Sequence, residues 1–579
     1  MATRANLDMS ASALSQDPTS ESDVDKALSD LHEHATEFAQ LSPAEKASLL
    51  EACVPRLLDV SAQWVASGAK AKGLAMDESG EEWLAGPMPT IRMARLLAES
   101  LREISATGKP SLGTKTSSGP GGRLRIDVFP NSKIDGALFT GFEGYALMQE
   151  GIDHNSASQR QASFFSEKDP QGGVSVVLGA GNVSSIPPMD TFTKMFTEGK
   201  VVLLKMNPVN EWVGPCLATA LAPLISRGFL RIVYGGGSVG KYLVENESIA
   251  DVHITGSDKT HDLIVWGPEG EERDRRMADN DPVLKVPICS ELGNVTPVAI
   301  VPYEYSDAEL AFQARNLATM VCNDASFNCN AAKMLVTGKG WTQREQFLDL
   351  LRDELKNVPL RKAYYPGAFD RYQSLVEGRD NVETFGQADD QHLPWTIITG
   401  LDSDNKDEPL FRVEPFCSIL SETQIGSADP VQFLQACIPF MNDTLWGTLA
   451  ATIIISPKLE NDPRVKAELD KVIVELRYGA IGINHWAGLI YGMTTLPWGG
   501  HPSATPKDIQ SGLGWVHNTY MLEGIDKSVI RGDLKIWPTP PWFVGNTATT
   551  ALGPKLTQME ADPGWTKVPG IALRALFGK

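Results

Sequence analysis

The stretch VSVVLGAGNVSSIPPMDTFTKMFTEGKVVLLKM, residues 174–206, contains the structural unit from which the fold of this chain can be inferred. Its first part, VSVVLGA (174–180), is a continuous apolar run of the kind found in buried parallel strands. A segment of helical length follows as far as Glu198, and VVLLKM (201–206) is a second apolar run. The stretch therefore predicts a strand–helix–strand unit with parallel strands.

The same alternation continues after residue 206. It predicts a doubly wound parallel sheet, whose nucleotide site lies at the carboxyl ends of the strands. A charged insert at 267–282 reads as a loop, and a second α/β alternation begins at TPVAIV (296–301). The further elements of the first sheet are predicted as helices at 214–226 and 239–246 and strands at 230–236 and 251–255.

The two ends of the chain depart from this pattern. Residues 1–25 are expected to be disordered, and residues 541–579, rich in Pro, Gly and Thr, are expected to form an extended tail. Between residues 23 and 109 the apolar spacing is helical. One helix should begin at Ser42, with Glu45 as its capping partner.

Bulk properties exclude several classes of function. At 579 residues the chain is too long for one core and should divide into about two to four lobes. A net charge of −20 argues against nucleic acid or an anionic membrane surface as a partner. The first residues lack the apolar core of a secretory signal, and no apolar run reaches the roughly 20 residues that span a bilayer. Seven cysteines without zinc spacing predict neither a disulfide framework nor a metal site, so a cytoplasmic protein is expected.

Five short motifs carry a family resemblance through their order and spacing. Asn182 follows the first strand of the quoted stretch, and Lys205 ends the second strand 23 positions later (205 − 182). Together with the later motifs they resemble the aldehyde dehydrogenase superfamily, from about residue 42 to about residue 520. The later motifs are TGS (255–257), ELG (291–293), EPF (414–416) and PWGG (497–500).

The resemblance implies an α/β fold with a Rossmann-type cofactor domain, an α/β catalytic domain and a small oligomerisation element. The N-terminal helices and the cofactor domain are expected at 26–288 and the catalytic domain at 289–484. A return segment with an oligomerisation strand is expected at 485–540, around residues 527–537. Residues 123–165 are further candidates for oligomerisation strands, and a homodimer or homotetramer is expected.

The resemblance also implies a role for each matching residue. Asn182 would donate a hydrogen bond to the oxyanion, and Glu291 would be the general base. Loss of such an oxyanion donor typically costs about 2.7–4 kcal/mol. Pro208 stands where many NAD-preferring members have a Glu, so NAD and NADP both remain open as cofactor. The cofactor would be held by Lys205 at the adenosine ribose, Gly256 and Ser257 at the pyrophosphate, and Glu414 and Phe416 at the nicotinamide end.

The nucleophile of the family is expected within CNDASFNCNAAKMLV (322–336). If Asn323 and Lys333 are aligned with the family pattern without a gap, Asn328 takes the nucleophile position and Cys329 lies one residue later. Either the loop absorbs a one-residue shift and Cys329 attacks the aldehyde, or Asn328 occupies the site. Asn cannot form a thiohemiacetal, so the second case would abolish oxidation.

Cys329 is favoured as the nucleophile because the other residues of the site are retained. Cys322 ends an apolar helical segment and is expected in the core, and Cys289 is a minor rival beside Glu291. The usual Gly-Gln pair of the family is replaced by Ala325-Ser326.

The reaction implied is oxidation of an aldehyde to a carboxylic acid through a thiohemiacetal and a thioester on Cys329. Two alternatives remain open. An acyl-CoA or acyl-phosphate reductase shares this fold, and GAGNV (179–183) has features of that branch, whereas the retained Glu291 argues against it. A non-catalytic relative is the alternative that Asn328 supports. Four aromatic residues are candidates for an apolar substrate funnel: Phe327, Trp486, Tyr491 and Trp498.

Overall fold

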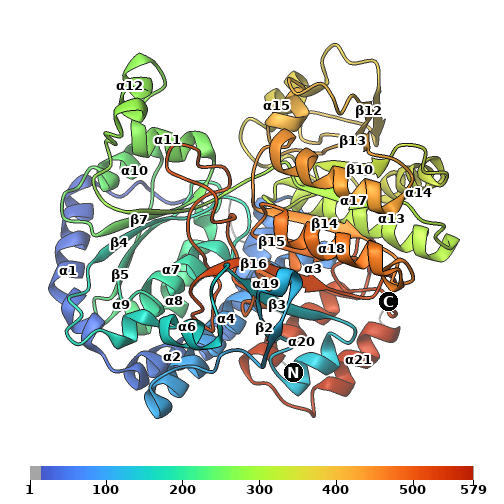
Figure 1. Cartoon of the computed structure of the whole chain (residues 1–579). Helices are drawn as coiled ribbons and strands as arrows, with labels where there is room; N and C mark the ends of the chain where they lie inside the picture. Colours follow the sequence, from blue (N-terminus) through green and yellow to red (C-terminus); the bar gives the residue numbers. More distant parts are fainter. Residues whose placement is uncertain (1–14, 578–579) are drawn as a thin grey trace.

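Two β-sheets form the frame of the molecule in the computed structural model, which describes residues 15–577 (Figure 1). The smaller sheet has five strands in the order β6-β5-β4-β7-β8. The larger has eleven strands in the order β1-β2-β3-β16-β15-β14-β9-β10-β13-β12-β11. Helices flank both sheets, so the α/β fold class predicted from the sequence is confirmed.

The unit predicted from residues 174–206 forms the centre of the smaller sheet. It comprises β4 (Val174–Leu178), α7 (Ile186–Phe196) and β5 (Val201–Lys205), and all strand pairs of this sheet are parallel. Every residue of α7 is buried, which explains why its sequence lacks the polar face of a surface helix. The other elements are α8 (Gly214–Ala220), α9 (Ala222–Ile225), β6 (Leu230–Val233), α10 (Gly237–Val244), β7 (Asp251–Gly256), α11 (Asp258–Trp266) and β8 (Ile288–Leu292).

The larger sheet is parallel from β16 to β12 and antiparallel at both ends. The chain enters it directly from the smaller sheet, because only four residues separate β8 from β9. Its strands are β1 (Lys115–Ser118), β2 (Leu124–Phe129), β3 (Glu143–Met148), β9 (Pro297–Ile300), β10 (Met334–Gly338), β11 (Val382–Phe385), β12 (Trp395–Leu401), β13 (Ile419–Ile425), β14 (Ala450–Ile454), β15 (Ala480–Ile483) and β16 (Ile525–Arg531). Its main helices are α13 (Asp307–Cys322), α14 (Arg344–Asn357), α15 (Ala368–Val376), α17 (Pro430–Pro439), α18 (Pro463–Glu475) and α19 (Leu489–Met493).

The region from 23 to 109 is helical, as predicted. The expected cap is present: the Glu45 N–H donates to Ser42 Oγ at 3.3 Å, and the Ser42 N–H donates to the Glu45 carboxylate at 2.9 Å. Within residues 15–577, no helix has both the length and the apolar composition that crossing a membrane requires. The helices are α1 (Glu21–Gln40), α2 (Pro43–Ala71), α3 (Gly80–Leu84) and α4 (Pro87–Thr107).

Two predictions of irregular structure are wrong in part. The insert 267–282 contains a helix, α12 (Glu271–Asp279), because charges spaced three and four residues apart pair along it, as Arg275 does with Glu272 and Asp279. At the N-terminus, residues 1–14 lie outside the described residues, but α1 already begins at Glu21.

The prediction of an extended C-terminal tail is also wrong. Residues Thr549–Ala561 form α20 and Val568–Phe577 form α21, despite the Pro, Gly and Thr content. Helix α20 contacts α3 and α4, and its Glu560 accepts hydrogen bonds from two arginines of α4. Tertiary packing therefore overrides weak helix propensity here.

The segments predicted to serve oligomerisation pair within their own chain. From 123–165 come β2 and β3, and from 527–537 comes most of β16. Strand β16 lies between β3 and β15, so these segments extend the chain's own sheet. Their role in an oligomer remains a prediction.

Candidate active site

The residues singled out by sequence meet where the two sheets join. Asn182 lies in the turn after β4, Glu291 lies near the carboxyl end of β8, and Cys329 lies in the loop between α13 and β10. The first two therefore occupy the carboxyl edge of the smaller sheet, the usual location of ligand sites in open α/β folds.

The loop that carries Cys329 has an unusual backbone. Asp324, Ala325 and Ser326 have φ values of 50°, 54° and 69°, in the left-handed region that non-glycine residues rarely adopt. Buried contacts hold this conformation: Lys333 Nζ donates to the Ser326 carbonyl at 2.8 Å, and Tyr364 Oη donates to Asp324 Oδ2 at 2.8 Å. Such strain persists only where the surroundings determine it, and it is concentrated at functional sites.

Asn328 and Cys329 have different surroundings. The Asn328 side chain bonds within its own loop, since its Nδ2 donates to Asn323 Oδ1 at 2.9 Å and its Oδ1 accepts from the Asn330 N–H at 3.3 Å. The Cys329 Sγ also donates within the loop, to Asn328 Oδ1 at 3.7 Å, but unlike Asn328 it lies within electrostatic reach of two carboxylates. Burial raises the pKa of Cys329 well above its ordinary value, and the charges of Glu291 and Glu414 raise it further.

Glu291 is a buried carboxylate with one free oxygen. Trp498 Nε1 donates to Glu291 Oε1 at 2.5 Å, whereas Oε2 has no hydrogen-bond partner among the described residues. Burial, followed by the charge of Asp190, raises the pKa of Glu291 to about 8. A carboxylate with a pKa close to neutral pH can both take and release a proton.

Asn182 faces the loop that carries Cys329, between α13 and β10. Its Nδ2 donates to the Phe327 carbonyl at 3.0 Å, two residues before Cys329. The amide carries a second hydrogen that no residue in the range 15–577 accepts, and the side chain is 5% exposed. This second N–H group is available to an oxygen atom bound beside the loop.

The sequence model of the aldehyde dehydrogenase family matches residues 137–505, which is well over half of the chain. This chain belongs to the aldehyde dehydrogenase family.

Solved structures agree on the fold, although their sequences are distant. Glyceraldehyde-3-phosphate dehydrogenase GapN from Methanocaldococcus jannaschii, crystallised with NADP, shares 15% identity at a TM-score of 0.58, covering 89% of this chain and 95% of that one. An NAD-dependent aldehyde dehydrogenase from Sinorhizobium meliloti shares 18% identity at a TM-score of 0.57, and the match covers 90% of this chain and 89% of that one. Aldehyde dehydrogenase 21 from Physcomitrella patens, in complex with succinate, shares 13% identity at a TM-score of 0.59, and the match covers 89% of this chain and 90% of that one. No curated protein sequence gives a significant match.

In this member of the aldehyde dehydrogenase family, the four predicted funnel aromatics lie in three different hydrophobic clusters. Tyr491 and Trp498 pack edge to face at 6.0 Å in the cluster that also contains Cys329. Phe327 packs away from them, against Tyr364 and Phe416. The fourth predicted residue is tied to the nucleophile loop, where Trp486 Nε1 donates to the Asn330 carbonyl at 2.8 Å.

The glycine of the aldehyde dehydrogenase Glu-Leu-Gly motif makes room for Glu414. A Cβ atom on Gly293 would lie 1.9 Å from Glu414 Oε2, so any larger residue would displace this carboxylate. Glu414 Oε1 has no hydrogen-bond partner in the described part of the chain. Burial raises the pKa of Glu414 to about 8, while Lys333 opposes this shift. A buried carboxylate oxygen without a partner is expected to accept a hydrogen bond from a bound molecule.

The residues expected at the other end of the cofactor lie along the same sheet edge. Burial lowers the pKa of Lys205 to about 8, and Glu211 opposes the shift. Glu211 was not identified from the sequence. It places a carboxylate near Lys205, whereas position 208, where many NAD-preferring members have a Glu, is a proline. Its Oε1 accepts hydrogen bonds from Ser15 Oγ at 3.1 Å and from the Gln16 N–H at 3.2 Å.

Helix α11 begins where a pyrophosphate site was expected. Gly256 ends β7, and Ser257 caps α11 by accepting from the Thr260 N–H at 3.2 Å. The following residue, Asp258, was also not identified from the sequence. Its charge adds to the effect of burial in raising the pKa of Glu414, against the opposing effect of Lys333. A carboxylate at this helix end opposes an anion, whereas the free N–H groups favour one.

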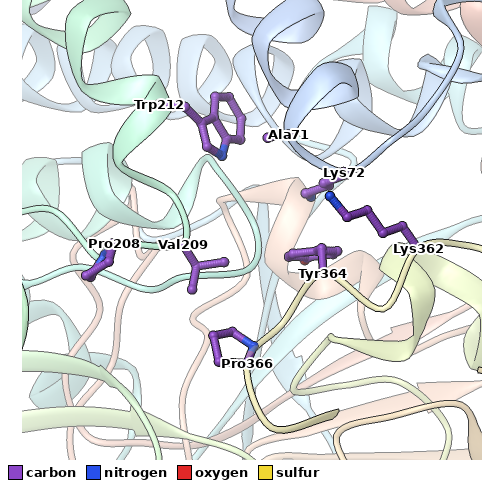
Figure 2. A pocket seen from close by; sticks show the side chains of 8 residues that line it. All are labelled: Ala71, Lys72, Pro208, Val209, Trp212, Lys362, Tyr364 and Pro366. Atoms are coloured by element: carbon purple, nitrogen blue, oxygen red, sulfur yellow. The ribbon is translucent and has the colours of Figure 1, made fainter. Parts of the chain in front are cut away.

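A cavity of about 320 Å³ adjoins the turn after Lys205 (Figure 2). The turn after β5 and the segment before α15 form facing walls, and the end of α2 contributes Lys72. Lys72 is not free to bind an anion, because its Nζ lies 2.8 Å from Asp324 Oδ1 and 2.9 Å from Glu82 Oε1. The lining residues are Ala71, Lys72, Pro208, Val209, Trp212, Lys362, Tyr364 and Pro366.

Proposed function

We propose that this chain oxidises an aldehyde to the corresponding carboxylic acid, with Cys329 as the nucleophile and NAD or NADP as the hydride acceptor. The observation that carries the proposal is the convergence of the Cys329 thiol with Glu291 and Glu414, next to the loop that Asn182 contacts. The coarser activity, that of an oxidoreductase acting on aldehydes, follows from family membership.

Each residue has a chemical task in this reaction. Glu291 is a carboxylate whose charge acts on the thiol, and we assign to it the ionisation of a thiol whose pKa is raised, first by burial. The Cys329 sulfur then bonds to the aldehyde carbon, while the second N–H of Asn182 stabilises the oxyanion. Loss of hydride from this carbon leaves a thioester. Glu291 takes a proton from water, the water oxygen bonds to the thioester carbon, and the C–S bond breaks to release the acid.

The cofactor residues fit a dinucleotide at both riboses. Glu414 offers an unpartnered buried oxygen, Lys205 lies at the end of β5, and Gly256 and Ser257 precede the first N–H groups of α11. Phe416 contacts Phe327 of the nucleophile loop. When bound, NAD or NADP would supply the hydride acceptor, and GapN, crystallised with NADP, supports this class of cofactor. The negative charges of Glu211 and Asp258 oppose binding of the additional 2′-phosphate that distinguishes NADP from NAD.

The proposal is tested by incubating the purified chain with a panel of aldehydes and following the absorbance of reduced nicotinamide. NAD and NADP are supplied separately, each with and without CoA. We expect turnover without CoA and release of the free acid. If no aldehyde gives reduced nicotinamide under any of the four conditions, the proposed function is refuted. The expected homodimer or homotetramer is tested by light scattering in the same preparation.

A CoA-acylating activity is the second candidate, favoured by one observation. Burial and Asp190 raise the pKa of Glu291 to about 8, so near neutral pH much of this carboxyl group is protonated and a weak base for water. A thiol acceptor would depend less on that base. Turnover that requires CoA in the aldehyde panel would identify this branch.

The pH dependence of thioester hydrolysis should follow Glu291. Only the ionised carboxylate accepts a proton from water, so the rate should rise with pH through about 8, and then level off. The measurement is the steady-state rate of acid formation between pH 6 and 10 at saturating aldehyde. In Glu291→Gln this rise should disappear together with most of the rate. A wild-type profile that is flat over this range would contradict the assignment.

Asn182→Ala should lower kcat by about 10²–10³-fold, because an oxyanion donor acts on charge that develops in the transition state. The substitution should change KM little, and the two constants are obtained from initial rates with a single aldehyde. Asn381→Ala is the matched control, since this exposed amide donates to the Thr399 carbonyl far from the loop. Equal effects of the two substitutions would argue against the role of Asn182.

A further inference from the structure

A column of polar side chains lies between α7 and the face of the smaller sheet that carries Glu291. Alternate residues of a strand point to the same face, so Asp251, His253 and Thr255 of β7 share one face. Strands β7 and β8 are parallel, with His253 opposite Cys289 and Thr255 opposite Glu291. Thr255 is therefore the neighbour of Glu291 across the sheet.

Helix α7 supplies the centre of the column through Asp190. Asp190 Oδ2 accepts a hydrogen bond from Thr255 Oγ1 at 2.8 Å and lies 3.1 Å from His253 Nε2. The same histidine nitrogen is 3.3 Å from Thr255 Oγ1. All three side chains are buried, with Asp190 at 0% and His253 at 1% exposure. They form one compact hydrogen-bonded group beside Glu291.

One turn further along α7 the column reaches the surface. Lys194 Nζ lies 3.4 Å from Asp251 Oδ1, two residues before His253, and donates to Glu198 Oε2 at 2.9 Å. The Glu198 side chain is 39% exposed, in contrast to the buried members of the column. Polar groups thus continue from the end of β8 at the active site to solvent at the end of α7.

Several buried atoms of this column lack partners among the described residues: Glu291 Oε2, Asp190 Oδ1 and His253 Nδ1. His517, which stacks edge to face on Tyr491 at 4.4 Å, has neither ring nitrogen satisfied within the same range. Leaving such atoms without partners is unfavourable, and native structures satisfy most of them with protein or water. Packing of the core does not by itself require buried polar atoms without partners at these positions.

Charge in the column affects Glu291 directly. Burial opposes a charged His253, but Asp190 and Cys289 raise the pKa of this imidazole well above its ordinary value. Protonated His253 in turn lowers the pKa of Glu291, against the larger effects of burial and Asp190. The titratable groups that face the column are Asp190 and Lys194 from α7, Asp251 and His253 from β7, Cys289 and Glu291 from β8, Tyr491 from α19, and His517 from the loop before β16.

We propose that Thr255, Asp190 and His253 form a buried proton path between Glu291 and solvent, continued by Asp251 and Lys194 to the surface at Glu198. The inference deepens the proposed function and rests on it, because Glu291 gains one proton for each thioester that water cleaves. The members of the path act through Glu291 and are positioning residues for the base.

Hydrolysis of p-nitrophenyl acetate tests the path without cofactor or aldehyde. Attack by Cys329 breaks the ester bond and releases p-nitrophenol in a burst, and the acetyl thioester is then hydrolysed with Glu291 as base. The burst therefore reports acylation of folded enzyme, and the steady-state rate reports hydrolysis. The variants are His253→Gln and Thr255→Val, and His485→Gln is the control, a buried histidine whose Nε2 contacts the Asp533 carbonyl instead.

We expect His253→Gln to keep the burst and to lower the steady-state rate by about 10- to 100-fold. Its pH profile should also shift to higher pH, because Glu291 loses a neighbouring cation. Thr255→Val should also lower the steady-state rate. If His253→Gln does not fold, Thr255→Val tests the path in its place. Normal steady-state rates and an unshifted profile in the folded variants would overturn the path and leave the proposed function intact. Absence of both p-nitrophenol release and acetylated Cys329 in the wild-type chain would overturn both.

Discussion

Cys329→Ala should abolish aldehyde-dependent reduction of the nicotinamide, with a loss in kcat/KM on the order of 10⁴-fold or more. The reason is chemical, since a thioester requires a thiol, and the Cys329 thiol lies within electrostatic reach of both Glu291 and Glu414. The measurement is initial rates with the best aldehyde of the panel. Binding of that aldehyde or of the cofactor should survive, because the substitution removes only the sulfur atom.

Two further substitutions distinguish Cys329 from its rivals. Asn328→Ala should leave substantial activity, because the Asn328 side chain bonds to Asn323 and Asn330 within the loop. Cys289→Ala should retain covalent chemistry, since Cys289 Sγ contacts the Leu513 carbonyl at 3.0 Å instead of facing the nucleophile loop. Full activity in Cys329→Ala combined with a dead Asn328→Ala enzyme would show that the one-residue shift does not occur.

Alkylation provides a second readout for the same residue. Of the seven cysteines, only Cys289 and Cys329 are partly exposed in the structure, and the other five are buried. Burial, then Glu291 and Glu414, raise the pKa of Cys329, so labelling by iodoacetamide should be slow near neutral pH and faster in alkaline solution. Peptide mass spectrometry should find Cys329 labelled in parallel with loss of activity.

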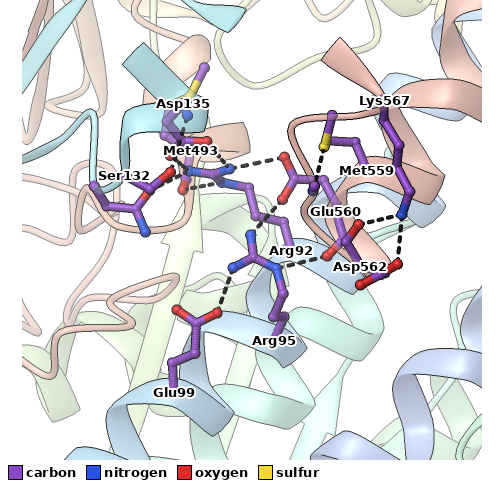
Figure 3. Close-up of polar contacts among 12 residues, drawn as sticks. Arg92, Arg95, Glu99, Ser132, Asp135, Met493, Met559, Glu560, Asp562 and Lys567 are labelled. Carbon is purple, nitrogen blue, oxygen red and sulfur yellow. Dashed lines mark hydrogen bonds and ion pairs between the residues drawn. The ribbon is translucent and has the colours of Figure 1, made fainter. Parts of the chain in front are cut away.

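Arg92→Met should lower the free energy of unfolding by about 3–5 kcal/mol, the usual consequence of breaking a buried ion pair from one side. Arg92 is 1% exposed and joins three distant parts of the chain (Figure 3). It contacts Asp135 Oδ2 at 2.6 Å and Glu560 Oε1 at 2.9 Å, and its Nε donates to the Met493 carbonyl at 2.9 Å. Removal of the guanidinium leaves the buried Asp135 carboxylate without its cation and leaves Glu560 with Arg95 alone.

Urea unfolding followed by circular dichroism measures this loss. Arg102→Met is the matched control, because Arg102 pairs with Glu51 on the surface, where both side chains are more than 40% exposed, and its removal should change stability far less. The Arg92→Met chain should also become more sensitive to proteolysis within α20, since Glu560 loses a partner. Equal midpoints for the two variants would mean that the C-terminal helix is not anchored through Arg92.

The parallel architecture was predictable from sequence because its signal is local. Apolar runs such as 174–178 and 201–205 reflect burial of a strand on both faces, and the helix between them is buried along its full length. The capping box at Ser42 is likewise determined by residues three positions apart.

Other features depend on contacts between residues far apart in the chain, which local patterns do not encode. The turns and helix propensities of 541–579 do not reveal α20, because its Glu560 pairs with an arginine 468 positions away. Asp190 and His253 each resemble an isolated polar residue in an apolar element, and only the packing of α7 on β7 brings them together.

The placement of Cys329 illustrates the division most clearly. The residue pattern predicted two runs of alternating strands and helices, the order of the family motifs and a loop that contains both Asn328 and Cys329. Only the tertiary structure decided that the Asn328 side chain bonds within the loop while the Cys329 thiol lies near Glu291 and Glu414. The physical reason is that the left-handed backbone of residues 324–326 sets the direction of the side chains that follow. Buried contacts from Tyr364 and Lys333, which lie later in the chain, hold that backbone.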